Sequence, residues 1–226
     1  MTIKVGHRGA AGHEPENTLR SFQKAIDFGV DMIECDVHST GDGEVVVIHD
    51  DRVDRTTNGK GKVSQMTLAE LKQLDAGKGE RIATLGEALD FVAGKCKLII
   101  EIKDRASAVP VAEIIKEKVL NKVIDWQDVL VESFDHHQIL AVKRHEPRIP
   151  IAPILGGMPI GYAAFADDLP CEAISICVHN LTPEFVADAR NRGKAVYVWT
   201  ANHADDIAHA YSMGVDGITS DYPDRL

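Results

Sequence analysis

The sequence predicts an α/β fold, a TIM-type (β/α)8 barrel with a β-hairpin added after the second strand. Apolar runs of strand length alternate with helical patterns along nearly the whole chain. Setting aside one hairpin arm leaves eight strands joined by segments long enough to be crossover connections. The length of 226 residues also suits one barrel of this type. We therefore expect a single barrel domain over residues 1–226.

The first elements of the chain establish the hairpin. Residues 3–7 form the expected first strand, and residues 17–28 the first helix, with Asn17 as its N-cap. Strand patterns follow at 32–37 and 45–49. A parallel crossover needs about a dozen residues or more, and the link over 38–43 is shorter than that. The strands at 32–37 and 45–49 should therefore pair antiparallel.

Residues 50–81 are the least regular segment of the chain. They are rich in Gly, Lys and Asp, with one short helix expected near 68–74. A long irregular stretch inside a compact domain is usually a functional loop. We therefore expect a short insertion loop lying over the site.

Helices and strands alternate regularly from residue 85 onward. Helices are expected at 85–92, 109–119, 135–145, 183–192 and 204–213, with a short one within 156–169. Strands are expected at 97–103, 129–134, 149–154, 173–177, 195–200 and 215–220. The sequence ends at Leu226, which leaves the eighth helix missing or vestigial.

Two carboxylates lie on one face of the second strand. Glu34 and Asp36 are two residues apart, so both side chains point to the same side of an extended chain. The residues of the opposite face, Ile33, Cys35 and Val37, are apolar. Because an unpaired buried carboxylate is very costly, a cation, a basic side chain or water must neutralise this pair.

A third carboxylate, Glu101, stands near the end of the next barrel strand, where function concentrates in this fold. Two unit charges about 4 Å apart repel by roughly 4 kcal/mol at an effective dielectric constant of about 20. An all-oxygen set of three carboxylates suits a hard cation such as Mg²⁺ or Ca²⁺. The alternative is a network of ion pairs with lysine and arginine.

Two histidines, His7 and His49, follow separate strands on the same rim. Their ordinary pKa suits general acid–base chemistry, although either could instead be a metal ligand or a hydrogen-bonded rim residue. Arg8 and Lys103 add positive charge beside the acidic cluster, as expected where a phosphate is held.

The composition excludes several classes of protein. A formal net charge of −10 argues against nucleic-acid binding, which usually needs a basic face. The four cysteines lie in apolar runs without metal-binding spacing, and no apolar run approaches the length of a membrane span. We expect a cytoplasmic protein without stable membrane association, and the sequence leaves its oligomeric state open.

An ordered series of motifs carries a family resemblance from His7 to about Asp221. The series comprises His7-Arg8-Gly9, Pro15-Glu16-Asn17-Thr18, Ile33-Glu34-Cys35-Asp36-Val37, Asp42-Gly43, Val47-Ile48-His49-Asp50, Arg55-Thr56, Glu101-Ile102-Lys103, Ser133-Phe134 and Trp199-Thr200-Ala201-Asn202. It resembles the motif series of the glycerophosphodiester phosphodiesterases, in their compact cytosolic form. Each motif alone is weak, whereas their order is specific.

The resemblance implies a phosphoric diester hydrolase that releases sn-glycerol 3-phosphate and an alcohol from a small-molecule diester. The alternatives are a lysophospholipase D-type activity on lipid diesters and a non-catalytic phosphate- or metal-binding barrel. The attacking group is either the glycerol 2-hydroxyl, through a cyclic phosphate, or water. The implied roles are metal ligands for Glu34, Asp36 and Glu101, acid–base catalysts for His7 and His49, phosphate contacts for Arg8 and Lys103, and pocket lining for Phe134 and Trp199.

Overall fold

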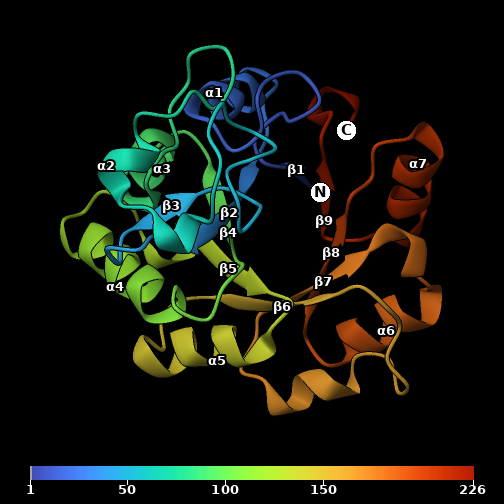
Figure 1. Cartoon of the computed structure of the whole chain (residues 1–226). Coiled ribbons are helices and arrows are strands. Elements are labelled where there is room, and N and C mark those ends of the chain that lie inside the picture. The colour runs from blue at the N-terminus through green and yellow to red at the C-terminus, as the bar shows by residue number, and fades with distance from the viewer. Residues whose placement is uncertain (1) are drawn as a thin grey trace.

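Eight parallel strands close into a barrel in the computed structural model, which describes residues 2–226 (Figure 1). The barrel closes because β1 pairs with both β2 and β9. The predicted TIM barrel is therefore confirmed. Its strands are β1 (Ile3–Gly6), β2 (Met32–Ser39), β4 (Lys97–Ile102), β5 (Val129–Ser133), β6 (Ile151–Leu155), β7 (Ala173–Cys177), β8 (Ala195–Trp199) and β9 (Gly217–Ser220).

The predicted hairpin is also present. Strand β3 (Val45–Val47) pairs antiparallel with the end of β2, with Val37 opposite Val47 and Ser39 opposite Val45. The chain then leaves β3 towards the barrel mouth, and Ile48 N–H donates to the carbonyl of Asp36. His49 therefore lies beside the carboxyl half of β2, as the short link predicts.

Helices surround the barrel, as Figure 1 shows. Helix α2 (Leu68–Leu71) lies in the insertion after β3, and the 3₁₀ turn η3 (Ala164–Asp168) occupies the β6–β7 connection. After β9, the last described element is the 3₁₀ turn η5 (Pro223–Arg225). The other helices are α1 (Leu19–Asp27), α3 (Leu85–Val92), α4 (Ala108–Leu120), α5 (His136–His145), α6 (Pro183–Asn191) and α7 (Ala204–Met213).

The prediction that Asn17 caps the first helix is wrong. Thr18 is the N-cap, and its side chain accepts a hydrogen bond from Ser21 N–H. Asn17 instead has a positive φ of 58° and turns its side chain towards the barrel interior, where it bonds Asp36. A short polar side chain tolerates this backbone region better than most residues do, which frees Asn17 for a site role.

The insertion between β3 and α3 is held by a small apolar cluster of its own. All of its buried members come from residues 46–82, and they are almost fully buried. Gly41 N–H donates to the carbonyl of Met66, and the bridge between Arg52 and Lys62 closes a loop within the insertion. This packing fixes the segment that carries His49. The cluster comprises Val46, Ile48, Val53, Val63, Leu71, Ala76 and Ile82.

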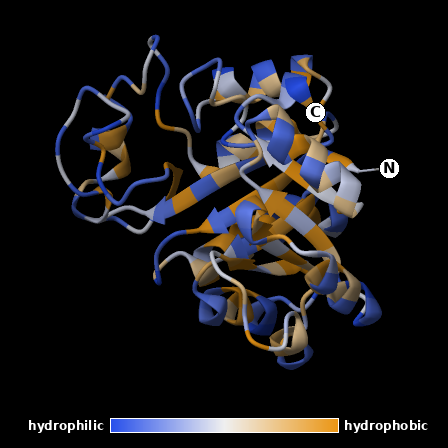
Figure 2. Cartoon of the chain, turned by 90° about the vertical axis from the view of Figure 1, so that its right-hand side faces the viewer, coloured by the Kyte–Doolittle hydropathy of each residue, from blue (hydrophilic) through white to orange (hydrophobic). Residues whose placement is uncertain are grey.

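The barrel interior has an apolar floor, and apolar strands occupy the centre of the molecule in Figure 2. The outward-facing residues Ile33, Cys35 and Val37 of β2 are fully buried in the main core, as their alternation predicts. The inward-facing residues near the amino ends of the strands form a second, separate cluster. It consists of Val5, Met32, Ile99, Leu130, Ala152, Ala173 and Tyr197.

Candidate active site

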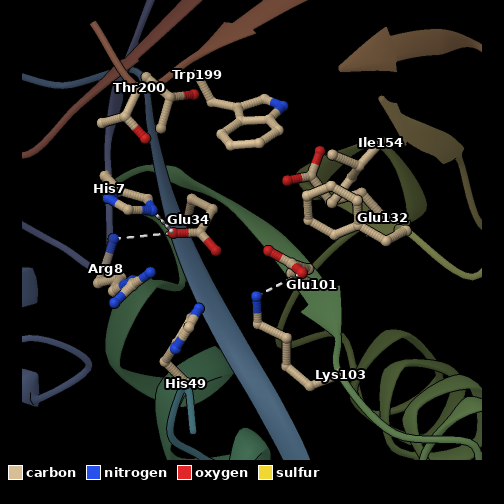
Figure 3. Close-up of a pocket in the computed structure, with 12 residues that line it drawn as sticks. His7, Arg8, Glu34, His49, Glu101, Lys103, Glu132, Ile154, Trp199 and Thr200 are labelled. Atoms are coloured by element: carbon tan, nitrogen blue, oxygen red, sulfur yellow. Dashed lines mark hydrogen bonds and ion pairs between the residues drawn. The ribbon is translucent and has the colours of Figure 1, made fainter. Parts of the chain in front are cut away.

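A cavity of about 190 Å³ opens above the apolar floor, at the carboxyl ends of the strands (Figure 3). Alternate residues of a strand face the same side, so the residue two positions after each floor residue also points inward. Thus His7 follows Val5, and Trp199 follows Tyr197. Of the predicted site residues, all except Asp36 line the cavity. Its lining is His7, Arg8, Glu34, His49, Glu101, Lys103, Glu132, Phe134, Ile154, Trp199, Thr200 and Thr219.

Three buried carboxylates meet in this cavity. One oxygen each of Glu34, Glu101 and Glu132 lies within 4.8 Å of the others, and the three residues are 3%, 8% and 6% exposed. Burial raises the pKa of each carboxyl, repulsion from neighbouring carboxylates adds to the shift, and the pKa of Glu132 reaches about 8. A divalent cation would remove this repulsion, so the residues present fit such an ion.

The Glu34 carboxylate has one oxygen bonded and one oxygen free. Its Oε2 accepts a hydrogen bond of 2.9 Å from Arg8 N–H and lies 3.8 Å from His7 Nε2. Its Oε1 is buried and has no hydrogen-bond partner among residues 2–226. Since a buried carboxylate oxygen without a partner is costly, this atom indicates a bound group.

Asp36 is fully buried and lies beside the group of three. Its Oδ2 accepts a 2.8 Å hydrogen bond from Asn17 Nδ2 and lies 3.2 Å from Arg8 Nε. Its Oδ1 forms an ion pair of 2.9 Å with Lys103 Nζ, which also bonds Glu101 Oε1 at 2.5 Å. Burial opposes ionisation, but attraction from Lys103 and Arg8 holds the pKa of Asp36 at about 2. Asp36 is therefore charged at neutral pH.

His7 is paired with a carboxylate that received no role from the sequence. Its Nδ1 donates to Asp221 Oδ1 over 2.6 Å, and Asp221 Oδ2 accepts a 2.6 Å bond from Asn202 Nδ2. Burial opposes the shift, but the hydrogen bond with His7 holds the pKa of Asp221 below its ordinary value. Asp221 directly follows β9, so its strand-end position was the signal that could have identified it.

His49 has an equivalent partner in Asp50. The two side chains lie 2.6 Å apart, and Asp50 also accepts hydrogen bonds from Arg55. Arg55 bonds Glu16, which in turn accepts from Arg8. Burial lowers the pKa of His49 below its ordinary value, although attraction from Asp36 and the hydrogen bond with Asp50 act in the opposite direction. This chain of charges, which spacing alone does not reveal, ties His49 to the phosphate-contact candidate Arg8.

A further histidine, His38, holds the backbone of His49 in place. It lies two residues beyond Asp36 on β2, and its Nε2 donates to the carbonyl of His49 over 3.0 Å. Its Nδ1 lies 3.3 Å from Asp104 Oδ2. These contacts fix the backbone of the loop that presents His49.

Phe134 and Trp199 form the apolar side of the cavity. Their rings meet edge to face, with centroids 5.4 Å apart and an interplanar angle of 84°. Phe134 is 51% exposed at the rim, whereas Trp199 is half-buried and Ile154 is buried. In Figure 3, Trp199 and Ile154 lie across the cavity from His49 and Arg8. The site therefore has one charged half and one half suited to an organic group.

A family model described as "Glycerophosphoryl diester phosphodiesterase family" matches residues 7–225. The chain belongs to this family. The expected enzyme class, a phosphoric diester hydrolase, and glycerophosphodiester phosphodiesterase activity are thereby supported. The family resemblance inferred from the motifs is confirmed.

Individual relatives support the same family membership over the whole chain. A glycerophosphodiester phosphodiesterase of Caldanaerobacter subterraneus subsp. tengcongensis is 35% identical, and the match covers 100% of this chain and 96% of the relative. The putative glycerophosphodiester phosphodiesterase YhdW of Bacillus subtilis is 38% identical, and the match covers 98% of this chain and 95% of the relative.

A similar solved structure is that of an Oleispira antarctica phosphodiesterase in complex with the product sn-glycerol-3-phosphate. It is 32% identical with a TM-score of 0.89, and the match covers 98% of this chain and 93% of that chain. The structure of a putative glycerophosphoryl diester phosphodiesterase of Silicibacter pomeroyi has a TM-score of 0.90 at 28% identity. The match covers 99% of this chain and 91% of that chain. Separately, none of the helices within residues 2–226 has the length and apolar character needed to cross a membrane.

Proposed function

We propose that this family member hydrolyses small glycerophosphodiesters to sn-glycerol 3-phosphate and an alcohol, with Mg²⁺ or Ca²⁺ and with His7 and His49 as an acid–base pair. The observation that carries the proposal is the presence of two histidine–aspartate pairs at one cavity. Each histidine is held by an aspartate at 2.6 Å, and both rings line the cavity that the buried carboxylates share.

The two histidines divide the proton transfers. One imidazole accepts the proton of the attacking hydroxyl, and the other donates a proton to the departing alkoxide. Asp221 and Asp50 orient the rings by bonding Nδ1, which leaves Nε2 of each ring free for the substrate. Such a pair contributes roughly 10²- to 10⁴-fold to the rate.

Positive charge on the same side holds the phosphate. Arg8 and Lys103 line the cavity and are themselves fixed by Asp36, so their remaining N–H groups are positioned before substrate arrives. Glu34, Asp36 and Glu101 would hold the cation, because hard cations prefer carboxylate oxygens. When bound, this ion supplies charge that stabilises a phosphoryl oxygen and lowers the pKa of the attacking hydroxyl. Phe134 and Trp199 would bury the organic part of the substrate.

The test is to replace each histidine separately by alanine. His7→Ala and His49→Ala should each lower kcat on a glycerophosphodiester by roughly 10²- to 10⁴-fold, while the variants remain folded. His145→Ala is the matched control, because His145 is exposed at the end of α5, outside the cavity. Unchanged activity in both site variants would refute the acid–base assignment and would favour different chemistry, whereas a wild type without activity would favour a non-catalytic barrel.

A lipid diester is the second candidate substrate, since apolar side chains are exposed at the cavity rim and in the loop that follows β6. Phe134 is 51% exposed, and Ile160 and Tyr162, in the loop after β6, are 106% and 39% exposed. Glycerophosphocholine and lysophosphatidylcholine, compared at equal concentration, separate the two activities. We expect the water-soluble diester to be the better substrate, because the cavity of about 190 Å³ is small.

The proposed partner is the small-molecule substrate alone, without nucleic acid and without stable membrane association. The proposed location is the cytoplasm. Support comes from the net charge of −10 and from four unpaired cysteines, two of them buried.

A further inference from the structure

Glu132 is a fourth carboxylate at the site, and the mechanism above gives it no role. It lies on β5, two residues after the floor residue Leu130, and therefore points into the barrel. Strand register places Asp36 beside Glu101 and Glu101 beside Glu132, so three adjacent strands each present one carboxylate at the same level. Buried at 6% exposure, Glu132 needs a compensating group.

Among the described residues, no basic side chain is paired with Glu132. Arg8 pairs with Glu16 and Asp36, and Lys103 pairs with Asp36 and Glu101. Within residues 2–226, no ion pair includes Glu132. When all four carboxylates of the site are ionised, they face two side-chain cations, and two negative charges are left uncompensated. One divalent cation would balance them.

The distances permit one ion to contact the three clustered carboxylates. Oxygens of Glu34, Glu101 and Glu132 all lie within 4.8 Å of one another. Ligands on opposite sides of a Ca²⁺ ion, at roughly 2.3–2.6 Å each, are about 4.6–5.2 Å apart, and neighbouring ligands are closer. All three oxygens can therefore belong to one coordination sphere.

An independent observation marks the same space as a ligand site. Glu34 Oε1 is buried, and among residues 2–226 it has no hydrogen-bond partner. Figure 3 shows this free oxygen and the Glu132 carboxylate turned towards the same region beside Glu101. A bound cation would give the unpartnered oxygen a partner and would offset the charge of Glu132.

We propose that Glu132 is a direct ligand of the cation, in addition to the residues proposed above. This inference rests on the cation requirement of the proposed function. It assigns a fourth carboxylate to the metal site. Glu132, on the right of Figure 3, would then give that wall of the cavity a polar contact with the ion.

Titration calorimetry with Mn²⁺ on the metal-free protein tests the proposal without measuring activity. Glu132→Gln should weaken binding roughly 10- to 100-fold, because one charged ligand is lost. Glu101→Gln serves as the positive control. Glu113→Gln is the matched control, since it removes the same charge from an exposed position on α4 and should leave affinity unchanged.

Two outcomes separate this inference from the proposed function. If the wild-type protein binds no divalent cation, the cation requirement itself fails. If the wild type binds Mn²⁺ and Glu101→Gln weakens binding while Glu132→Gln does not, the assignment of Glu132 alone is overturned. Thermal unfolding in EDTA checks folding, and Glu132→Gln should not lower Tm there, because it removes a buried repulsive charge.

A crystal structure of the wild type soaked with Ca²⁺ gives a test that does not depend on any variant. We expect a Glu132 oxygen at about 2.3–2.6 Å from the ion. A bound ion whose distance from both Glu132 oxygens exceeds about 3.5 Å would overturn the proposal.

Discussion

The substitution Asp221→Asn would test how His7 is held. Asp221 Oδ1 accepts the Nδ1 proton of His7 over 2.6 Å, and Asn202 fixes the other oxygen of the same carboxylate. Asp221→Asn preserves the shape of the side chain but removes its charge. It also allows the amide to present its N–H₂ group to Nδ1 of His7. This contact would favour the tautomer that carries its proton on Nε2.

The expected size of the effect follows from the kind of hydrogen bond that is lost. A hydrogen bond to a charged group contributes about 1.5–3 kcal/mol, and each 1.36 kcal/mol of barrier changes the rate about tenfold. We therefore expect kcat to fall about 10- to 150-fold. KM should change little, because Asp221 does not line the cavity.

Steady-state kinetics on a glycerophosphodiester, with release of glycerol phosphate as the readout, measure both parameters. Asp224→Asn is the matched control, since Asp224 accepts a 2.7 Å hydrogen bond from His13 outside the cavity. An unchanged kcat in Asp221→Asn, or a loss confined to KM, would refute the positioning role. An equal loss in the control would point to a general effect on folding.

Two further predictions concern stability. Asn17→Ala should lower the free energy of unfolding by about 2–4 kcal/mol in urea denaturation. It removes the hydrogen bonds that the Asn17 amide makes with Asp36 Oδ2 and Asp36 N–H, and it strains a backbone with φ of 58°. Asn17→Gly, which accepts that φ, should lose about 1 kcal/mol less, and equal losses would exclude strain. Burial opposes the shift, but hydrogen bonds from His38, Ser39 N–H and Ser107 hold the pKa of Asp104 at about 2, below its unfolded value. The stability that Asp104 contributes is therefore present above about pH 4 and is lost as the pH falls towards 2. Between these pH values, the free energy of unfolding of the wild type should fall by about 1 kcal/mol more than that of Asp104→Asn. Parallel acid-unfolding curves for the two proteins would contradict this.

Much of the site was predictable because strand periodicity and strand ends are properties of the sequence. The alternation around Glu34 and Asp36 predicted an inward acidic face, and the short link after β2 predicted the hairpin that delivers His49. The rule that function lies at the carboxyl ends of barrel strands then brought Glu101 and Trp199 to the same cavity.

The remaining features depend on register and on loop conformation, which one sequence does not reveal. The register between β4 and β5 sets Glu132 beside Glu101, and a shift of one residue would have turned it outward. The positive φ of Asn17 depends on the turn that surrounds it, so its cap-like sequence was misleading. The partner of His7, Asp221, comes from the far end of the chain.

Turnover of a panel of glycerophosphodiesters tests the central claim most directly, with each substrate assayed in EDTA, in Mg²⁺ and in Ca²⁺. Phosphorus NMR identifies the product. The account predicts release of sn-glycerol 3-phosphate with at least one of the two cations and its loss in EDTA. Undiminished turnover after exhaustive chelation, or no cleavage of any diester with either cation, would contradict it.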